Sequence, residues 1–263
     1  MDKETVREAV WDTLEERSEA RFPFPPHGRI PNVAGADDAS DRLTATEEWS
    51  AARTLKCNPD APQLPVRRAA LRAGKTVYVA QPRLRDPDPF LRLDPATIED
   101  VNEATTVSGI STHGVAVPPE DVPSIGLIVS GSVAVTTAGA RIGKGEGYSD
   151  LEWAVLRELG AVDDDTTVAT TVHELQVVDG VESPIDTGAA DKPAADSTTG
   201  SDVDSTTSLP RPDAHDVPID LVVTPDRAIR TNTPYRRPEG VDWDALDEER
   251  LAEIPVLAER EPT

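Results

Sequence analysis

Cysteine and long apolar runs are nearly absent from this sequence of 263 residues. Cys57 is its only cysteine, so neither a disulfide nor a cysteine-based zinc cluster can form within the chain. No stretch approaches the roughly 18 uninterrupted apolar residues of a membrane span, and the N-terminus MDKETVREAV carries charges where a signal peptide has an apolar run. We therefore expect a soluble protein without a membrane partner in the reducing cytoplasm. The histidines lack the spacing of metal ligands: His27, His113, His173 and His215.

Positive charge is also scarce. The chain holds 49 acidic residues against 26 Lys and Arg, a formal net charge of −23. Repulsion of this size weakens a compact state at low ionic strength, and salt relieves it because the Debye length falls to about 3 Å at 1 M. We therefore predict a halophilic protein, the alternative being an ordinary acidic protein. The same negative field argues against nucleic acid as the main partner.

Helical and strand-like patterns alternate along the chain. Apolar residues at helical spacing predict helices at 3–17, 44–56, 63–73 and 149–160. Runs of β-branched and apolar residues predict strands at 76–82, 125–135, 166–178 and 219–224, with a bend at Gly131 in the second run. Short connections between alternating elements predict an α/β fold, a three-layer α/β/α sandwich with a mostly parallel open sheet.

Two segments depart from this alternation. Prolines in 21–35, RFPFPPHGRIPNVAG, predict an extended, ordered segment in which His27 and Arg29 are candidates to close over a site. Residues 180–216 hold no aromatic side chain and cannot bury enough apolar surface to offset the entropy of ordering. We predict that 180–216 form a disordered acidic insertion within one domain spanning residues 1–263.

The stretch RIGKGEGYSD, residues 141–150, joins a predicted strand to a predicted helix. Its glycines let backbone amides approach an anion, the helix N-terminus adds its dipole, and Arg141 and Lys144 supply positive charge. The pattern matches neither a P-loop nor a dinucleotide fingerprint. It predicts a phosphate-binding turn, the alternative being a plain connection between strand and helix.

The same stretch resembles the R-[LI]-G-x-G-x-G-Y-[YF]-D signature of the 5-formyltetrahydrofolate cyclo-ligase family. Lys3 and Arg7 match the K-x-x-x-R of its first helix, GKTVYVAQPRLR resembles its G-K-x-[VI]-x-x-P-R strand, and VPIDLVVTPDRAI resembles its closing segment. Gln176 stands where the family has a glutamine. The pieces FPxPxHxRIPNxxG, VxSGSVAV and RIGKGEGYxDLE are shared with the methenyltetrahydrofolate synthase domain-containing branch. The resemblance covers about residues 3–179 and 217–230 and implies a NagB-RpiA-like sandwich.

The resemblance implies an enzyme that cyclises 5-formyltetrahydrofolate, a reduced folate, to 5,10-methenyltetrahydrofolate with ATP and Mg²⁺, releasing ADP and phosphate. Phosphorylation of the formyl oxygen turns it into a leaving group while N10 closes the ring. Arg141 and Lys144 are the implied catalytic cations, Asp150 the Mg²⁺ ligand, and Tyr148 and His173 the substrate contacts. The implied ATP-binding residues are Lys3, Arg7, Gly143, Lys144, Gly145, Gly147, Tyr148 and Asp150.

Each of these functional roles has a purely structural alternative. Lys3 and Arg7 also suit a solvated helix face, Asp150 suits the first turn of a helix, and His173 suits a satisfied histidine at a strand end. Two departures concern the folate side: Ser149 replaces a signature aromatic, and Pro62 stands where the family has an acidic residue near the formyl group. They favour a paralogue acting on another, thiamin-related heterocycle. A non-catalytic nucleotide- or RNA-binding protein is a further alternative.

Overall fold

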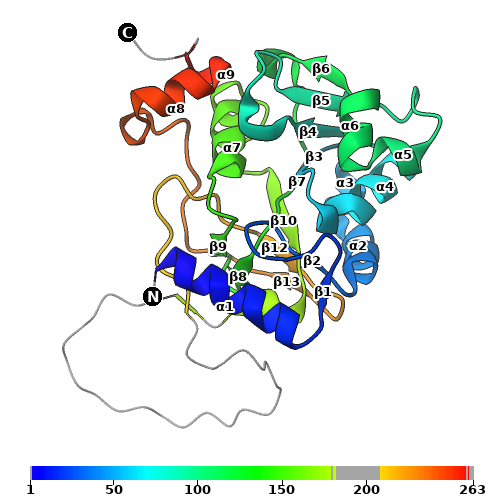
Figure 1. Ribbon diagram of the computed structural model, residues 1–263. Coiled ribbons are helices and arrows are strands. Elements are labelled where there is room, and N and C mark those ends of the chain that lie inside the picture. The colour runs from blue at the N-terminus through cyan, green and yellow to red at the C-terminus, as the bar shows by residue number, and fades with distance from the viewer. Residues whose placement is uncertain (1, 179, 182–207, 259, 261–263) are drawn as a thin grey trace.

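An eight-stranded sheet forms the centre of the molecule (Figure 1). The computed structural model describes residues 2–178, 180–181, 208–258 and 260. The strands of this sheet are β3 (Thr54–Cys57), β4 (Thr76–Ala80), β5 (Phe90–Leu93), β6 (Val115–Val117), β7 (Leu127–Val129), β10 (Thr167–Thr171), β12 (Leu221–Val223) and β13 (Ala228–Arg230). Their spatial order is β13-β12-β10-β7-β3-β4-β5-β6. The strands from β12 to β4 run parallel, and antiparallel pairs lie at both edges.

Helices cover both faces of this sheet (Figure 1). One face carries α2 (Ala36–Thr44), α3 (Glu47–Ala51), α4 (Leu64–Arg72), α5 (Val101–Ala104) and α6 (Val107–His113). The other face carries α7 (Tyr148–Glu158), α8 (Glu248–Glu253) and α9 (Pro255–Ala258). Successive strand residues alternate between the two cores: Val77 and Val79 pack on the first face, Tyr78 and Ala80 on the second. The predicted three-layer α/β/α sandwich with a mostly parallel sheet is confirmed.

A smaller unit lies against one end of the sheet. It consists of α1 (Lys3–Glu16), the hairpin-like pair β1 (Ala20–Arg21) and β2 (Asn32–Val33), and the three-stranded sheet of β11 (Val177–Val178), β8 (Ala134–Thr136) and β9 (Arg141–Ile142). The side chain of Asp2 caps α1 by accepting a hydrogen bond from Thr5 N at 2.9 Å. Val6, Val10 and Leu14 bury the apolar face of this helix, as their spacing predicts. The short 3-10 helices are η1 (Ala61–Gln63), η2 (Pro82–Leu84), η3 (Pro119–Asp121), η4 (Glu174–Gln176) and η5 (Trp243–Ala245).

The prediction of one helix over 44–56 is wrong. The structure ends α2 at Thr44, forms the short α3, and then begins the strand β3 at Thr54. Leu55 and Cys57 are fully buried against one helical layer, while Lys56 between them meets a partner on the other. Tertiary burial on both faces therefore overrides a helical pattern that is only local.

The apolar run 125–135 divides into two strands rather than forming one. Leu127–Val129 belong to the central sheet, whereas Ala134–Thr136 belong to the small sheet. The predicted bend at Gly131 falls two residues later, at Val133. Gly131 instead allows close packing, because a Cβ there would lie 2.9 Å from Ile30 Cγ1 and 3.3 Å from Asp60 Oδ2. The predicted strand at 166–178 divides in the same way, into β10 and β11 with η4 between them.

Of the acidic segment 180–216, residues 182–207 lie outside the described residues. Its described end is placed against the body: Leu209 is buried and bridges Val181, and Asp216 pairs with Lys3. Among the residues that the structure describes, no helix combines the length and the apolar character needed to cross a membrane.

Candidate functional site

A crevice opens where the order of the parallel strands reverses. The chain places β4 on one side of β3 and later places β7 on the other side, so the connections that leave β3 and β7 diverge. Asn58 follows β3 and Gly131 follows β7; the Asn58 side-chain oxygen accepts a hydrogen bond from Gly131 N at 3.3 Å. A cavity of about 200 Å³, the smaller cavity, lies at this point.

The glycine-rich turn forms one wall of the smaller cavity. Gly145 has a φ of 105°, and Gly147, which caps α7, has a φ of 70°. Arg7 donates from Nε to Gly143 O at 2.8 Å, and its guanidinium carbon lies 3.3 Å from where a Cβ of Gly145 would be. The left-handed backbone therefore favours glycine at 145, and any larger side chain there would also have to displace the Arg7 guanidinium.

Arg141 and Asp150 hold each other in fixed positions behind the turn. Arg141 donates to Asp150 Oδ1 at 2.7 Å and to Gly131 O at 3.0 Å, and both side chains are largely buried. Asp150 Oδ1 also accepts a hydrogen bond from Val217 N at 3.0 Å. The charge of Arg141 is thus shared with Asp150, and Asp150 Oδ2 is the oxygen left to face a ligand.

The predicted phosphate-facing lysines lie in different places. Lys144 lines the smaller cavity and pairs with Glu146 at 2.8 Å. Lys3 lines neither of the two cavities described here, because its Nζ lies 2.8 Å from Asp213 and 2.7 Å from Asp216. Burial acts to lower the pKa of Lys3, but its bonds to the two carboxylates outweigh burial and raise it. The structure therefore neutralises Lys3 with the end of the acidic segment.

Asp60 is a site residue that the sequence did not single out. It lies beside Gly131 on the wall of the smaller cavity, and burial raises the pKa of its carboxyl against the opposing charge of Lys144. The charges of Arg67 and Lys56 also oppose that shift. Pro62, which marked the expected loss of an acidic residue, is buried in η1. Asp60, two positions earlier, supplies an acidic group at the cavity.

Lys56 and Glu152 form an ion pair at the floor of the smaller cavity. Lys56 projects from β3, Glu152 projects from α7 and lines the cavity, and both side chains are almost completely buried. Burial raises the pKa of Glu152, although the charge of Lys56 opposes that shift. The signal in the sequence was a lysine inside the apolar strand TLKC, because a buried lysine needs a partner.

Ser149 lines this cavity and presents a hydroxyl group where the family signature has an aromatic ring. Its Oγ lies 2.9 Å from Ser130 Oγ and 3.5 Å from the Asn58 side-chain oxygen. The position at which the family signature has an aromatic ring is therefore part of a polar network that joins α7 to the ends of β7 and β3.

A larger cavity of about 550 Å³ lies on the other side of the turn. Its walls are the first turns of α7, the glycine-rich turn and the segment 238–253. Tyr148 lines both cavities, as do Gly147 and Asp150. The turn and the N-terminus of the 11-residue helix α7 are therefore shared by the two cavities, which places a favourable site for an anion between them.

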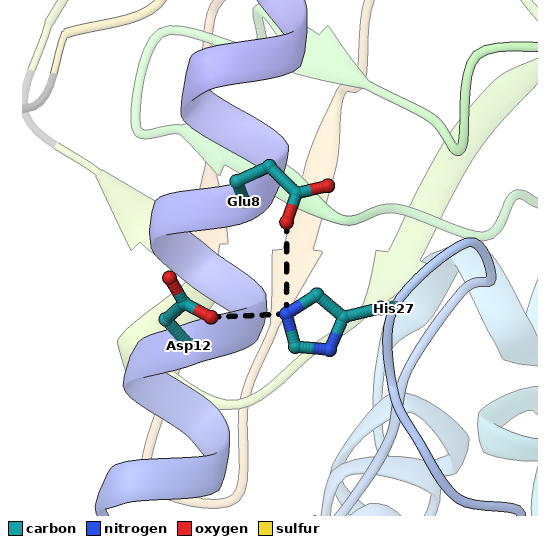
Figure 2. Close-up of side chains that lie close together, drawn as sticks. All are labelled: Glu8, Asp12 and His27. Carbon is teal, nitrogen blue, oxygen red and sulfur yellow. Dashed lines mark hydrogen bonds and ion pairs between the residues drawn. The ribbon is translucent and has the colours of Figure 1, made fainter.

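The histidines proposed for the site serve local structure. His173 Nδ1 accepts a hydrogen bond from Leu175 N at 3.2 Å and caps η4; burial lowers its pKa, and it lines neither cavity. Figure 2 shows His27 turned toward α1, with its Nε2 3.0 Å from Asp12 Oδ1 and 3.7 Å from Glu8 Oε2. His27 thus ties the proline-rich segment to the first helix.

Comparison with known proteins gives the following relatives. The model of the 5-formyltetrahydrofolate cyclo-ligase family matches residues 1–191. The methenyltetrahydrofolate synthase domain-containing protein of Mus musculus is 37% identical over 260 residues, 98% of this chain and 62% of that protein. The Homo sapiens protein of the same name is 33% identical over 98% of this chain and 61% of its own length. The chain thus spans about three fifths of these relatives. The NMR structure of Aquifex aeolicus 5,10-methenyltetrahydrofolate synthetase covers 90% of this chain and 96% of its own, with 17% sequence identity and a TM-score of 0.47.

Proposed function

Because the chain belongs to the 5-formyltetrahydrofolate cyclo-ligase family, we propose that it converts 5-formyltetrahydrofolate to 5,10-methenyltetrahydrofolate at the expense of ATP. The observation that carries this proposal is the glycine-rich turn, which lies between two cavities at the N-terminus of α7. A reaction that transfers the γ-phosphoryl group of ATP to a second substrate must bind both molecules with the phosphates between them. The turn supplies that position.

The phosphates of ATP bind at this turn. Its amides and the α7 dipole attract an anion, Lys144 adds a charge at the wall of the smaller cavity, and Arg7 braces the turn from behind. Asp150 Oδ2, at the junction of both cavities, suits Mg²⁺, which proteins hold through one or two carboxylates together with substrate phosphates. When bound, this ion neutralises charge on the phosphates during transfer.

The smaller cavity takes the reacting end of the folate. At about 200 Å³ it is below the range of roughly 300 to 1,000 Å³ that holds whole drug-sized ligands, so the rest of the substrate extends outside it. The formyl oxygen bonds to the γ-phosphorus and ADP leaves; N10 then bonds to the formyl carbon and the C–O bond breaks, releasing phosphate. Asp60 accepts the proton that N10 loses, and its raised pKa makes it a stronger base than an ordinary carboxylate.

A second candidate is the same chemistry on another heterocycle, related to thiamin. The Ser149, Ser130 and Asn58 network favours it, because hydroxyls and an amide replace the aromatic surface against which a pterin would stack. A substrate with more hydrogen-bonding groups and less ring surface fits this wall better.

The experiment is an assay of purified protein in concentrated KCl with ATP, Mg²⁺ and 5-formyltetrahydrofolate, followed by the absorbance of the methenyl product. Product that forms only when ATP and Mg²⁺ are both present supports the proposal. ATP binding without product transfers the support to the second candidate. Failure to bind ATP at all would leave the proposed nucleotide site, and with it both candidates, without a basis.

A further inference from the structure

The C-terminal segment 236–258 is bound along the length of α7. Trp153 Nε1 donates to Pro238 O at 3.0 Å, and Val241 N donates to Glu158 Oε1 at 2.9 Å. Ile254 and Leu257 are completely buried in the core on this face of the sheet. The segment is therefore a fixed wall of the larger cavity, although it lies beyond the residues that the family model matches.

Arg250 reaches from this segment to the glycine-rich turn. Its guanidinium lies 4.1 Å from the centre of the Tyr148 ring, and it donates to Tyr148 Oη at 2.9 Å and to Glu146 O at 2.6 Å. Arg250 and Tyr148 both line the larger cavity. Together they give it a flat, charged stacking surface, since a guanidinium plane stacks on aromatic rings.

The rest of the lining combines apolar and charged side chains, with Arg83 and His215 among the charged ones. Leu151, Ala154 and Leu246 supply the apolar surface, and Asp242 and Asp247 supply carboxylates. Flat heterocycles stack on the first kind of surface, and hydroxyl or amino groups donate to the second. A volume of about 550 Å³ lies within the range of small-ligand sites.

We propose that this larger cavity binds the nucleoside half of ATP, with the C-terminal segment as its outer wall and Arg250 as the stacking partner of the base. The inference rests on the proposed function, because it assumes that the phosphates lie at the turn. Asp242 and Asp247 accept hydrogen bonds from the ribose hydroxyls or the amino group of the base. Carboxylates at this wall repel a phosphate chain and the glutamate tail of a folate, so neither of those fits the cavity as well.

Arg250 has a competing role as a brace. Its bond to Glu146 O holds the turn, and loss of that bond alone would disturb the phosphate-binding amides. The two roles make different predictions. A stacking partner affects ligands that carry a base, whereas a brace affects every ligand that carries phosphates.

The test compares ATP with inorganic triphosphate, both with Mg²⁺, by calorimetric titration of the full chain in concentrated KCl. In Arg250→Met we expect the Kd for ATP to rise about tenfold, the size of a lost stacking contact, while the Kd for triphosphate stays within about twofold. Arg250→Lys keeps the charge without the planar guanidinium and is expected to lose most of the same affinity. Arg260→Met removes an arginine just beyond this segment that pairs with Glu120 outside the cavity, and it serves as the matched control.

Each outcome decides between the roles. A loss confined to ATP supports the nucleoside cavity. An equal loss for both ligands identifies a brace and overturns the inference, and so does an unchanged Kd for ATP; in both cases the proposed function stands. A wild-type protein that binds neither ligand overturns the proposed function itself, and this inference with it.

Discussion

The two cavities that meet at the glycine-rich turn are formed by different structural elements. The smaller cavity lies at the ends of parallel strands and gathers charged groups whose partners are fixed, among them Arg141 with Asp150 and Lys56 with Glu152. The larger cavity lies between one helix and the C-terminal segment, and its walls combine apolar side chains such as Leu151 and Leu246 with carboxylates such as Asp242 and Asp247. Strand ends hold side chains rigidly, which suits chemistry. The helix α7 and the C-terminal segment provide a larger contact surface for a ligand, which suits binding.

This contrast predicts that substitutions at the smaller cavity affect stability and turnover, whereas substitutions at the larger one affect affinity. A substitution in one cavity should leave the properties of the other unchanged, unless it lies in the turn that both cavities share.

The largest effect is expected at the floor of the smaller cavity. Lys56→Met leaves the carboxylate of Glu152 buried without its partner, and we expect a loss of about 3 to 5 kcal/mol in the free energy of unfolding. The double variant Lys56→Met with Glu152→Leu removes both charges and should recover to within about 1 kcal/mol of wild type. Denaturant unfolding at constant salt measures both values.

The matched control is an exposed pair. Arg157→Met breaks the contact with Asp164 at 3.0 Å and is expected to cost less than about 1 kcal/mol. If Lys56→Met costs no more than this control, the pair does not organise the cavity floor.

A substitution at Asp60 tests whether the smaller cavity affects turnover rather than ATP affinity. Asp60→Asn removes the proposed base, and we expect kcat/KM to fall about 10²- to 10⁴-fold while the Kd for ATP stays within about twofold. The base works ionised and its pKa is raised above 3.8, so the wild-type rate should rise with pH through that raised pKa. This limb should vanish in the variant. Initial rates across pH provide the measurement.

Asp121→Asn changes an exposed aspartate outside both cavities and serves as the control for Asp60→Asn. Its turnover and pH profile should match wild type. A wild-type rate in Asp60→Asn would remove Asp60 from the mechanism.

Cys57 lies next to Lys56 on β3, and its side chain is buried on the opposite face of the sheet. Burial raises the pKa of its thiol from 9.0 to about 11. The folded pKa is the higher one, so this stabilisation is complete below pH 9.0 and is lost as pH rises to about 11. That loss amounts to about 3 kcal/mol. The pH dependence of unfolding, wild type minus Cys57→Ala, isolates it; identical slopes would show that the thiol is not sealed from solvent.

The smallest effect is expected at Lys144, on the wall of the smaller cavity. Lys144→Gln removes a half-exposed cation from the turn and should raise the Kd for ATP about tenfold without a measurable change in stability. Lys3→Gln is the comparison, because Asp213 and Asp216 already neutralise Lys3. We expect less than about a threefold change there. Equal losses in both variants would mean that Lys3 exchanges its carboxylates for phosphates.

The turn was the part of the site that could be predicted from the sequence. Alternating glycines between a strand and a helix determine local backbone geometry, and the structure has the left-handed backbone at Gly145 and Gly147 that this pattern favours. Asp60 and Glu152 could not be found in this way. They are far apart in the sequence and share a cavity only because β3 pairs with β7 and α7 packs on the sheet.

By itself, the sequence determined the features that depend on neighbours along the chain: the amphipathic first helix, the strand at 76–80 and the glycine-rich turn. The tertiary structure decided which charges are neutralised. It pairs Lys3 with Asp216 and Lys56 with Glu152 across many residues of chain. A buried charge must find a partner wherever the fold provides one, and no local pattern specifies which partner that is.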